Sequence, residues 1–308
     1  MGFTALIALV DLVWIPIAGF TVTFSRGTAF SEACVVALAC AAALLAISSI
    51  ARYRDLTNRF RCREISFALG LIVSIGVFTH IALIFSYLCA AINTPTIDQS
   101  IVRIEALFGV SWPEIYGWVK AHATVHSIFL FAYRSGIFQL GLVPVILSVT
   151  GRGDDAAEFF SLYAVSSIAV VLFAGLLPAE SAFIHFGITD PKTASTVSHF
   201  EPLRNGSLRT IELGAGQGLV SFPSFHTMMA IFFAYSVRHV RFVFPVALAL
   251  NAVMIASTIT VGGHYLTDVL GGIVCGVAAI LAIRAAFQGH TSKHRAADRA
   301  APAADAGG

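Results

Sequence analysis

Several stretches of the sequence contain about 20 mostly apolar residues, which is the length that a helix needs to cross a lipid bilayer. These stretches fall at about 3–23, 31–50, 65–93, 127–149, 159–178, 224–238, 242–261 and 266–287. We therefore expect an all-α fold: a polytopic integral membrane bundle with about eight transmembrane helices, and six as the lower bound.

The composition excludes an ordinary soluble domain. Of the 308 residues, 57% are hydrophobic and only 12% are charged,. The formal net charge of +2 is too small to indicate a nucleic-acid partner. None of the five cysteines forms a C-x-x-C pair and four lie in apolar stretches, so we interpret them as small buried residues,.

The positive charges predict how the chain is oriented in the membrane. The loop at 51–64 contains five arginines, which the positive-inside rule places in the cytoplasm,. Counting crossings from there puts four further basic positions on the same side: Arg152, Arg238 with Arg241, Arg284, and the segment 293–299. Both termini are then cytoplasmic, and 94–126 and 180–223 face outward from the cell (inner) membrane. Asp11 and the lack of an early basic residue indicate a retained first span rather than a cleaved signal peptide,.

The chain divides into four segments on this basis. Residues 1–93 form the N-terminal transmembrane helices, and 94–126 form an outward segment at the membrane interface. Residues 127–288 form the core bundle, with its motifs at 222–268, and 289–308 form a disordered cytoplasmic tail,. Tryptophan and tyrosine beside charged residues in 94–126 favour a helix lying in the interface, which covers a site, admits lipid or acts as a passive anchor.

Two histidines near the ends of consecutive apolar spans form the main constellation. His226 ends the run Phe-Pro-Ser-Phe-His, and His264 is followed four residues later by Asp268. Pro223 suits a first helical turn and Ser224 suits a cap, so we expect a helix from Pro223. If the two spans form a hairpin, both histidines lie at the outer face, with Asp268 one turn below His264 on the same helix face.

This constellation suits transfer of a phosphate ester. A neutral imidazole can attack phosphorus if a carboxylate holds its other ring N–H, and His264 with Asp268 provides that pair. His226 would protonate the leaving oxygen and later activate the acceptor. The same three residues could instead bind a metal ion such as zinc.

Five further residues are candidates for substrate binding. The backbone N–H groups around Ser224 and Phe225 at a helix start form an anion site,. Gly263 allows close approach of the backbone. Arg204 and Arg209 lie in the outward loop about 20 residues before His226, where they could neutralise phosphate or remain solvated loop charges.

The motif residues resemble a known family. Phe-Pro-Ser-Phe-His at 222–226 and Gly-His-x-x-x-Asp at 263–268 are similar to motifs of the type 2 phosphatidic acid phosphatase superfamily, which read Lys-x6-Arg-Pro, Pro-Ser-Gly-His and Ser-Arg-x5-His-x3-Asp. The match covers about the last third of the chain. The resemblance implies that His264 is the nucleophile, Asp268 its partner and His226 the acid–base, with no metal and no cofactor.

The chain departs from those motifs in an informative way. Phe225 replaces the glycine of Pro-Ser-Gly-His, Thr258 stands where the third motif has arginine, and Lys-x6-Arg-Pro is missing. The inositol phosphorylceramide synthase-like branch has the same losses, and its motifs Phe-Pro-Ser-x-His and His-Tyr-x-x-Asp both occur here, at 222–226 and 264–268. Arg204 and Arg209 are the nearest outward candidates to replace the missing cations.

We therefore expect a membrane enzyme that cleaves or transfers a lipid phosphate ester. Water as acceptor makes it a phosphatase, and a polar or lipid alcohol makes it an inositolphosphotransferase-like enzyme; the sequence leaves the lipid, the acceptor and the oligomeric state open. The alternative class is a transporter or scaffold with a polar path along Asp11, His80, Arg134 and Asp268,.

Overall fold

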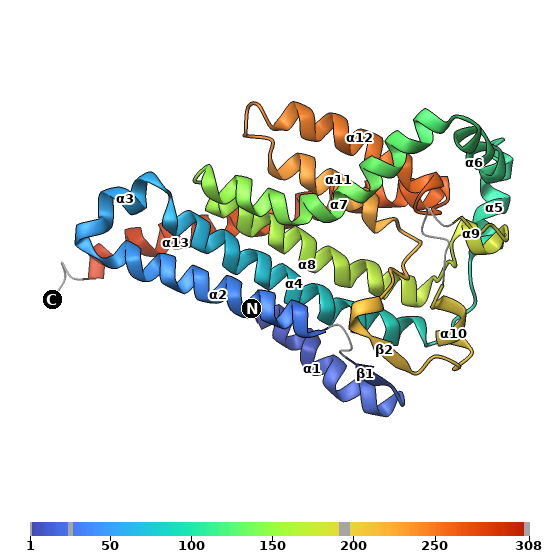
Figure 1. The fold of residues 1–308 in the computed structure, drawn as a ribbon, viewed down its shortest axis with the longest axis horizontal. Coiled ribbons are helices and arrows are strands. Elements are labelled where there is room, and N and C mark those ends of the chain that lie inside the picture. The colour runs from blue at the N-terminus through green and yellow to red at the C-terminus, as the bar shows by residue number, and fades with distance from the viewer. Residues whose placement is uncertain (1, 24–26, 191–197, 305–308) are drawn as a thin grey trace.

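The computed structural model describes residues 2–23, 27–190 and 198–304, and most of them are helical (Figure 1). The first half of the chain contains α1 (Gly2–Ile17), β1 (Thr21–Thr23), α2 (Gly27–Ser49), η1 (Ala51–Tyr53), α3 (Arg54–Arg59), α4 (Cys62–Ala90), α5 (Asp98–Leu107), α6 (Trp112–Ala121) and α7 (Ala123–Val149). The second half contains α8 (Gly153–Leu176), α9 (Ala182–His185), α10 (Phe200–Arg204), β2 (Thr210–Glu212), η2 (Leu213–Ala215), α11 (Phe225–Ser236), α12 (Phe244–Thr260) and α13 (Leu266–Ala304).

The predicted all-α membrane bundle is confirmed. Among the described residues, five helical stretches are long and apolar enough to cross a bilayer: Phe30–Ser49, Cys62–Ala90, Ala123–Val149, Gly153–Leu176 and Leu266–Phe287. The apolar helices α1 and α12 are shorter. The long helices run side by side along the long axis of the molecule (Figure 1).

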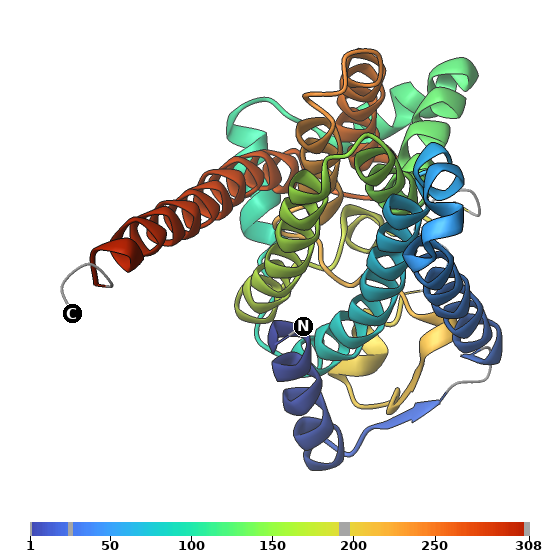
Figure 2. The same cartoon turned by 90° about the vertical axis from the view of Figure 1, so that its left-hand side faces the viewer.

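Two predicted segments differ from the structure. The span expected at 3–23 is helical only to Ile17, because Gly19 adopts a left-handed conformation (φ +69°) and the chain then enters β1,. β1 pairs in parallel with β2. The tail expected to be disordered from 289 is helical to Ala304, where α13 extends away from the other helices (Figure 2). Its alanine, lysine and arginine residues have high helix propensity.

The basic loops gather at one end of the bundle. Arg61 of the loop after α2 donates to the carbonyl of Val149 at 2.6 Å. Arg152 of the next loop donates to the carbonyl of His239, in the loop after α11, at 3.1 Å. The segments predicted to face outward, which include α5, α6, α9 and α10, lie at the other end (Figure 1).

The helix α11 occupies the centre of the core, in contact with α7, α8, α12 and α13. Its contact with α13 is close because Gly272 and Gly276 of α13 form a Gly-x-x-x-Gly pair facing it,. A Cβ at Gly272 would lie 2.6 Å from the carbonyl oxygen of Ser224 and 2.9 Å from Thr227 Cβ. This spacing brings the start of α11 against the first turns of α13.

We predict that Gly272→Ala separates α11 from α13. Overpacking a tight contact of this kind costs about 1–3 kcal/mol, so the melting temperature in detergent should fall by several degrees. Gly141→Ala in α7 is the control, because a Cβ there meets no atom within 4 Å. Equal melting temperatures for the two variants would contradict the close packing.

Candidate active site

The start of α11 is set by a serine cap. Ser224 has an extended backbone, and its hydroxyl accepts a hydrogen bond from a first-turn N–H, so the helix begins at Phe225,. The predicted cap is confirmed, whereas the predicted start at Pro223 is wrong, because this proline precedes the cap. His226 thus lies in the first turn of α11. Its ring stacks on Tyr133 of α7, with centroids 4.5 Å apart and an interplanar angle of 22°.

His264 lies in the turn between α12 and α13. A pair of glycines follows α12, and Gly263 has a φ of +71°, a conformation that glycine adopts without strain,. The next helix begins only at Leu266. The sequence predicted that His264 and Asp268 share one helix face. This prediction is wrong, because His264 precedes the helix that carries the carboxylate of Asp268.

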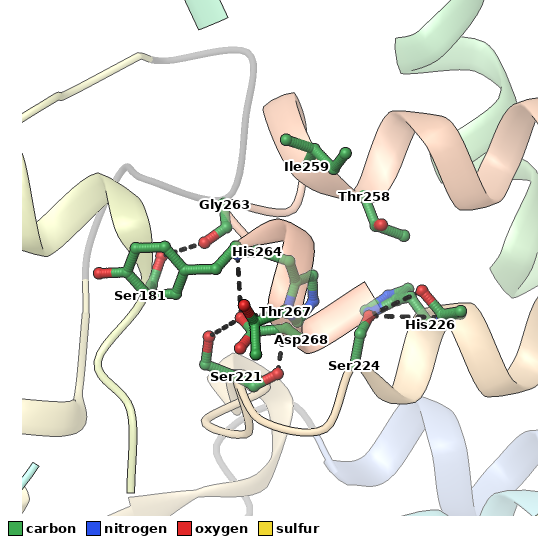
Figure 3. Close-up of polar contacts among 12 residues, drawn as sticks. Ser181, Ser221, Ser224, His226, Thr258, Ile259, Gly263, His264, Thr267 and Asp268 are labelled. Carbon is green, nitrogen blue, oxygen red and sulfur yellow. Dashed lines mark hydrogen bonds and ion pairs between the residues drawn. The ribbon is translucent and has the colours of Figure 1, made fainter. Parts of the chain in front are cut away.

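The carboxylate of Asp268 nevertheless contacts the histidine, as Figure 3 shows. Asp268 is fully buried, and its Oδ2 lies 3.4 Å from His264 Nδ1. The same oxygen accepts hydrogen bonds from the Ser221 hydroxyl at 2.8 Å and from the Tyr265 N–H at 3.0 Å. The second contact follows the capping-box pattern, in which a side chain near the helix start reaches back to the cap residue.

The contacts of His264 define its tautomer. Its Nδ1 lies 3.0 Å from the carbonyl oxygen of Ser221, in addition to the Asp268 carboxylate. A carbonyl and a carboxylate both accept hydrogen bonds, so Nδ1 carries the proton and Nε2 keeps its lone pair.

The structure brings the two predicted histidines together. The ring centroids of His226 and His264 are 6.3 Å apart, with an interplanar angle of 55°. Both line a cavity of about 330 Å³ at the end of the bundle opposite the basic loops. Its other polar lining residues are Tyr133, Glu180, Ser181, Ser198, Gln217 and Ser221.

Three of the predicted substrate-binding residues, Ser224, Phe225 and Gly263, do not line this cavity. They lie beside it and contact other parts of the protein. The N–H of Ser224 donates to the carbonyl of Asp268 at 3.0 Å. The ring of Phe225 packs into the core. The carbonyl of Gly263 accepts from the Ser181 hydroxyl at 3.1 Å, and a Cβ at this glycine would lie 2.6 Å from the same hydroxyl oxygen.

The two predicted arginines also lie outside the wall. Arg204 donates to the carbonyl of Thr94 at 2.6 Å and packs over Phe200. Arg209 is exposed and packs over Phe20. In the part of the chain that the structure describes, no lysine or arginine lines the cavity, and no group of three histidine, cysteine or acidic side chains could hold a metal ion.

Two carboxylates of α5, which sequence reasoning did not select, hold the turn around His264. Glu105 accepts a hydrogen bond from the N–H of Thr267 at 2.7 Å, where a negative charge stabilises the start of α13,. Asp98 accepts from the hydroxyl of Tyr265 at 2.9 Å and from the N–H of Glu180 at 3.0 Å. Both carboxylates are buried.

The indole of Trp112 in α6 also holds this turn. Asp98, Glu105 and Trp112 together form what we call the outer support of His264. Its N–H donates to the carbonyls of His264 and Ile259, each at 3.1 Å. The segment 94–126 was predicted to cover a site, to admit lipid or to act as a passive anchor; in the structure its buried side chains hold the turn around His264. The seven-residue spacing of Asp98 and Glu105, which puts both on one helix face, is the signal that could have revealed this.

We predict that Tyr265→Phe lowers turnover of lipid phosphate as well as stability, because it removes a donor to the buried carboxylate of Asp98 next to the turn that carries His264. The loss should be about 1–3 kcal/mol in stability. Tyr235→Phe is the matched control: its hydroxyl donates to Glu158 at 2.9 Å, at the opposite end of the bundle. If both variants lose stability and neither loses turnover, the outer support has no role in the site.

The family model described as the PAP2 superfamily, the type 2 phosphatidic acid phosphatases, matches residues 99–282. Searches among curated proteins and solved structures give no match. The matched range covers more than half of the chain and includes α5 from its second residue, both histidines and Asp268. The chain therefore belongs to the PAP2 superfamily.

Proposed function

We propose that this protein cleaves or transfers a lipid phosphate ester through a phosphohistidine formed on His264, without a metal ion. Family membership supports a phosphatase-type enzyme that acts on lipid phosphates. The observation that carries the finer proposal is the orientation of His264, whose Nδ1–H is held by Ser221 and Asp268. This leaves the lone pair of Nε2 for attack on phosphorus.

In the first step, Nε2 of His264 attacks phosphorus and the bond to the lipid oxygen breaks. The leaving oxygen takes a proton from His226, which must enter the step as the imidazolium. The positive charge that develops on the phosphorylated His264 is stabilised by Asp268, which contacts its Nδ1–H,.

In the second step, an acceptor hydroxyl gives its proton to His226 and attacks phosphorus, and the P–N bond breaks. Water as acceptor releases phosphate. An alcohol as acceptor gives a new phosphate ester, as in the inositol phosphorylceramide synthase-like branch that the motifs at 222–226 and 264–268 resemble.

Phosphate binding in this site depends on neutral donors in the described wall. Thr258, which stands where the family motif has arginine, donates its hydroxyl to the carbonyl of Ile255 within its own helix. The N–H of Ser224 is occupied by Asp268. We assign the phosphoryl oxygens to the first-turn N–H of His226, which lines the cavity at the start of α11, since a helix N-terminus favours an anion,.

We predict that His264→Ala and Asp268→Asn abolish turnover while the protein still inserts into the membrane. The expected losses are at least about 10³-fold for the nucleophile and about 10²-fold or more for its partner. The assay measures phosphate release from short-chain phosphatidic acid in detergent, with a chelator present.

His80→Ala is the control for that assay, because His80 lies in α4 and does not line the cavity. It should keep near wild-type turnover. Full activity of His264→Ala, or loss of wild-type activity on chelation, would contradict the proposal.

We propose further that the cavity opens to the periplasm or exterior and that both termini are cytoplasmic. The contacts among the basic loops at the end opposite the cavity support this orientation, through the positive-inside rule,. In a cysteine-free background, an impermeant maleimide applied to intact cells should label cysteine at the exposed position of Glu114 but not at that of Asn58. The reverse pattern would overturn the orientation.

A transport path has less support. Asp11 and His80 do not line the cavity that holds His226 and His264. His80 is hydrogen-bonded through Nδ1 to the carbonyl of Gly76 in its own helix.

A further inference from the structure

The wall of the cavity has an unusual charge for a phosphate site. Among the lining residues in the described part of the chain, Glu180 is the single carboxylate, and no lysine or arginine is present. The remaining polar groups, apart from the two histidines, are hydroxyls and one amide, from Tyr133, Ser181, Ser198, Ser221 and Gln217. Such a wall is suited to a ligand that donates hydrogen bonds rather than to a second anion.

Glu180 is held beside the nucleophile from two directions. On one side, the N–H of Ala182 and the hydroxyl of Ser181 donate to the carbonyl of Gly263, at 2.8 and 3.1 Å. On the other side, the N–H of Glu180 donates to Asp98, which accepts from the hydroxyl of Tyr265. Residues 263 and 265 flank His264, so the position of Glu180 is coupled to that of the attacking nitrogen.

The backbone at this point is strained. Ser181 has a φ of +125°, a region that residues other than glycine rarely adopt,. Contacts to Gly263 maintain this conformation, which also caps α9. Strain of this kind persists where the surroundings hold a residue in a required position, here next to Glu180.

The carboxylate of Glu180 is available to a ligand. No residue in the described part of the chain donates a hydrogen bond to it, although the side chain is half-buried. Burial raises its pKa, and the neighbouring carboxylates Asp98 and Glu201 raise it further, against Arg204 and His185, which lower it. The local potential therefore favours a positive or hydrogen-bond-donating group.

We propose that Glu180 forms a subsite for the acceptor alcohol and selects short alcohols that carry a second donor, an ammonium or a hydroxyl, on the neighbouring carbon. This inference rests on the proposed function, since it concerns the second half of that reaction. The acceptor hydroxyl gives its proton to His226 and attacks phosphorus, the P–N bond to His264 breaks, and Glu180 holds the second group. An acceptor with its own carboxylate is repelled.

The first test uses the wild-type protein. With dioctanoyl phosphatidic acid as donor, ³¹P NMR measures how the phosphoryl group is divided between water and 2-aminoethanol, 1-propanol or glycolate at equal concentration. We expect 2-aminoethanol to capture about tenfold more than 1-propanol, the effect of one charge-assisted hydrogen bond, and glycolate to capture less than either. Equal capture of all three alcohols, or capture of none alongside normal phosphate release, overturns the subsite and leaves the hydrolase proposal intact.

The second test uses Glu180→Gln, which keeps the shape of the side chain and removes its charge. The preference for 2-aminoethanol over 1-propanol should fall towards unity, and the disadvantage of glycolate should shrink. The matched control is Glu114→Gln, because Glu114 is exposed on α6, does not line the cavity and should keep the wild-type preference. An unchanged preference in Glu180→Gln contradicts the inference. By contrast, absence of any phosphate release from wild type would contradict the proposed function itself.

Discussion

The arrangement of the site depends on one buried carboxylate, that of Asp268. Its Oδ2 contacts the His264 ring, the Ser221 hydroxyl and the Tyr265 N–H, and its backbone carbonyl accepts from the N–H of Ser224. These contacts join three segments: the lead-in to α11, the turn after α12 and the first turn of α13. Because a buried carboxylate without donors is costly, the three segments are stable only when they meet in this way.

The membrane environment explains how the segments reach one another. Transmembrane helices associate through close packing rather than through a hydrophobic gradient, and small residues allow backbones to approach. Gly272 and Gly276 allow this close approach of the backbones of α13 and α11. The turn itself lies at the end of the bundle, where polar side chains of α5 and α6 can satisfy backbone groups that no transmembrane helix reaches.

The features that could be predicted from the sequence are those that depend on a local pattern of residues. Apolar stretches of bilayer length predicted the helical bundle, and the motif around His226, His264 and Asp268 predicted which residues meet. Prediction from the sequence failed where contacts come from distant segments: Asp98 and Trp112 act on a turn more than 140 residues away, through hydrogen bonds that no local pattern encodes. The two predicted phosphate-binding arginines were chosen by nearness in the chain, and the structure places them outside the cavity wall.

The central claim is that the phosphoryl group is carried by the imidazole whose other nitrogen Asp268 holds. Rapid acid-free quenching of the enzyme with ³²P-labelled phosphatidic acid, followed by peptide mapping, tests it most directly. We expect acid-labile, alkali-stable phosphate on the peptide that contains His264, formed and lost at rates consistent with turnover. Phosphate on any other residue, or turnover with no covalent intermediate at any time point, would contradict it.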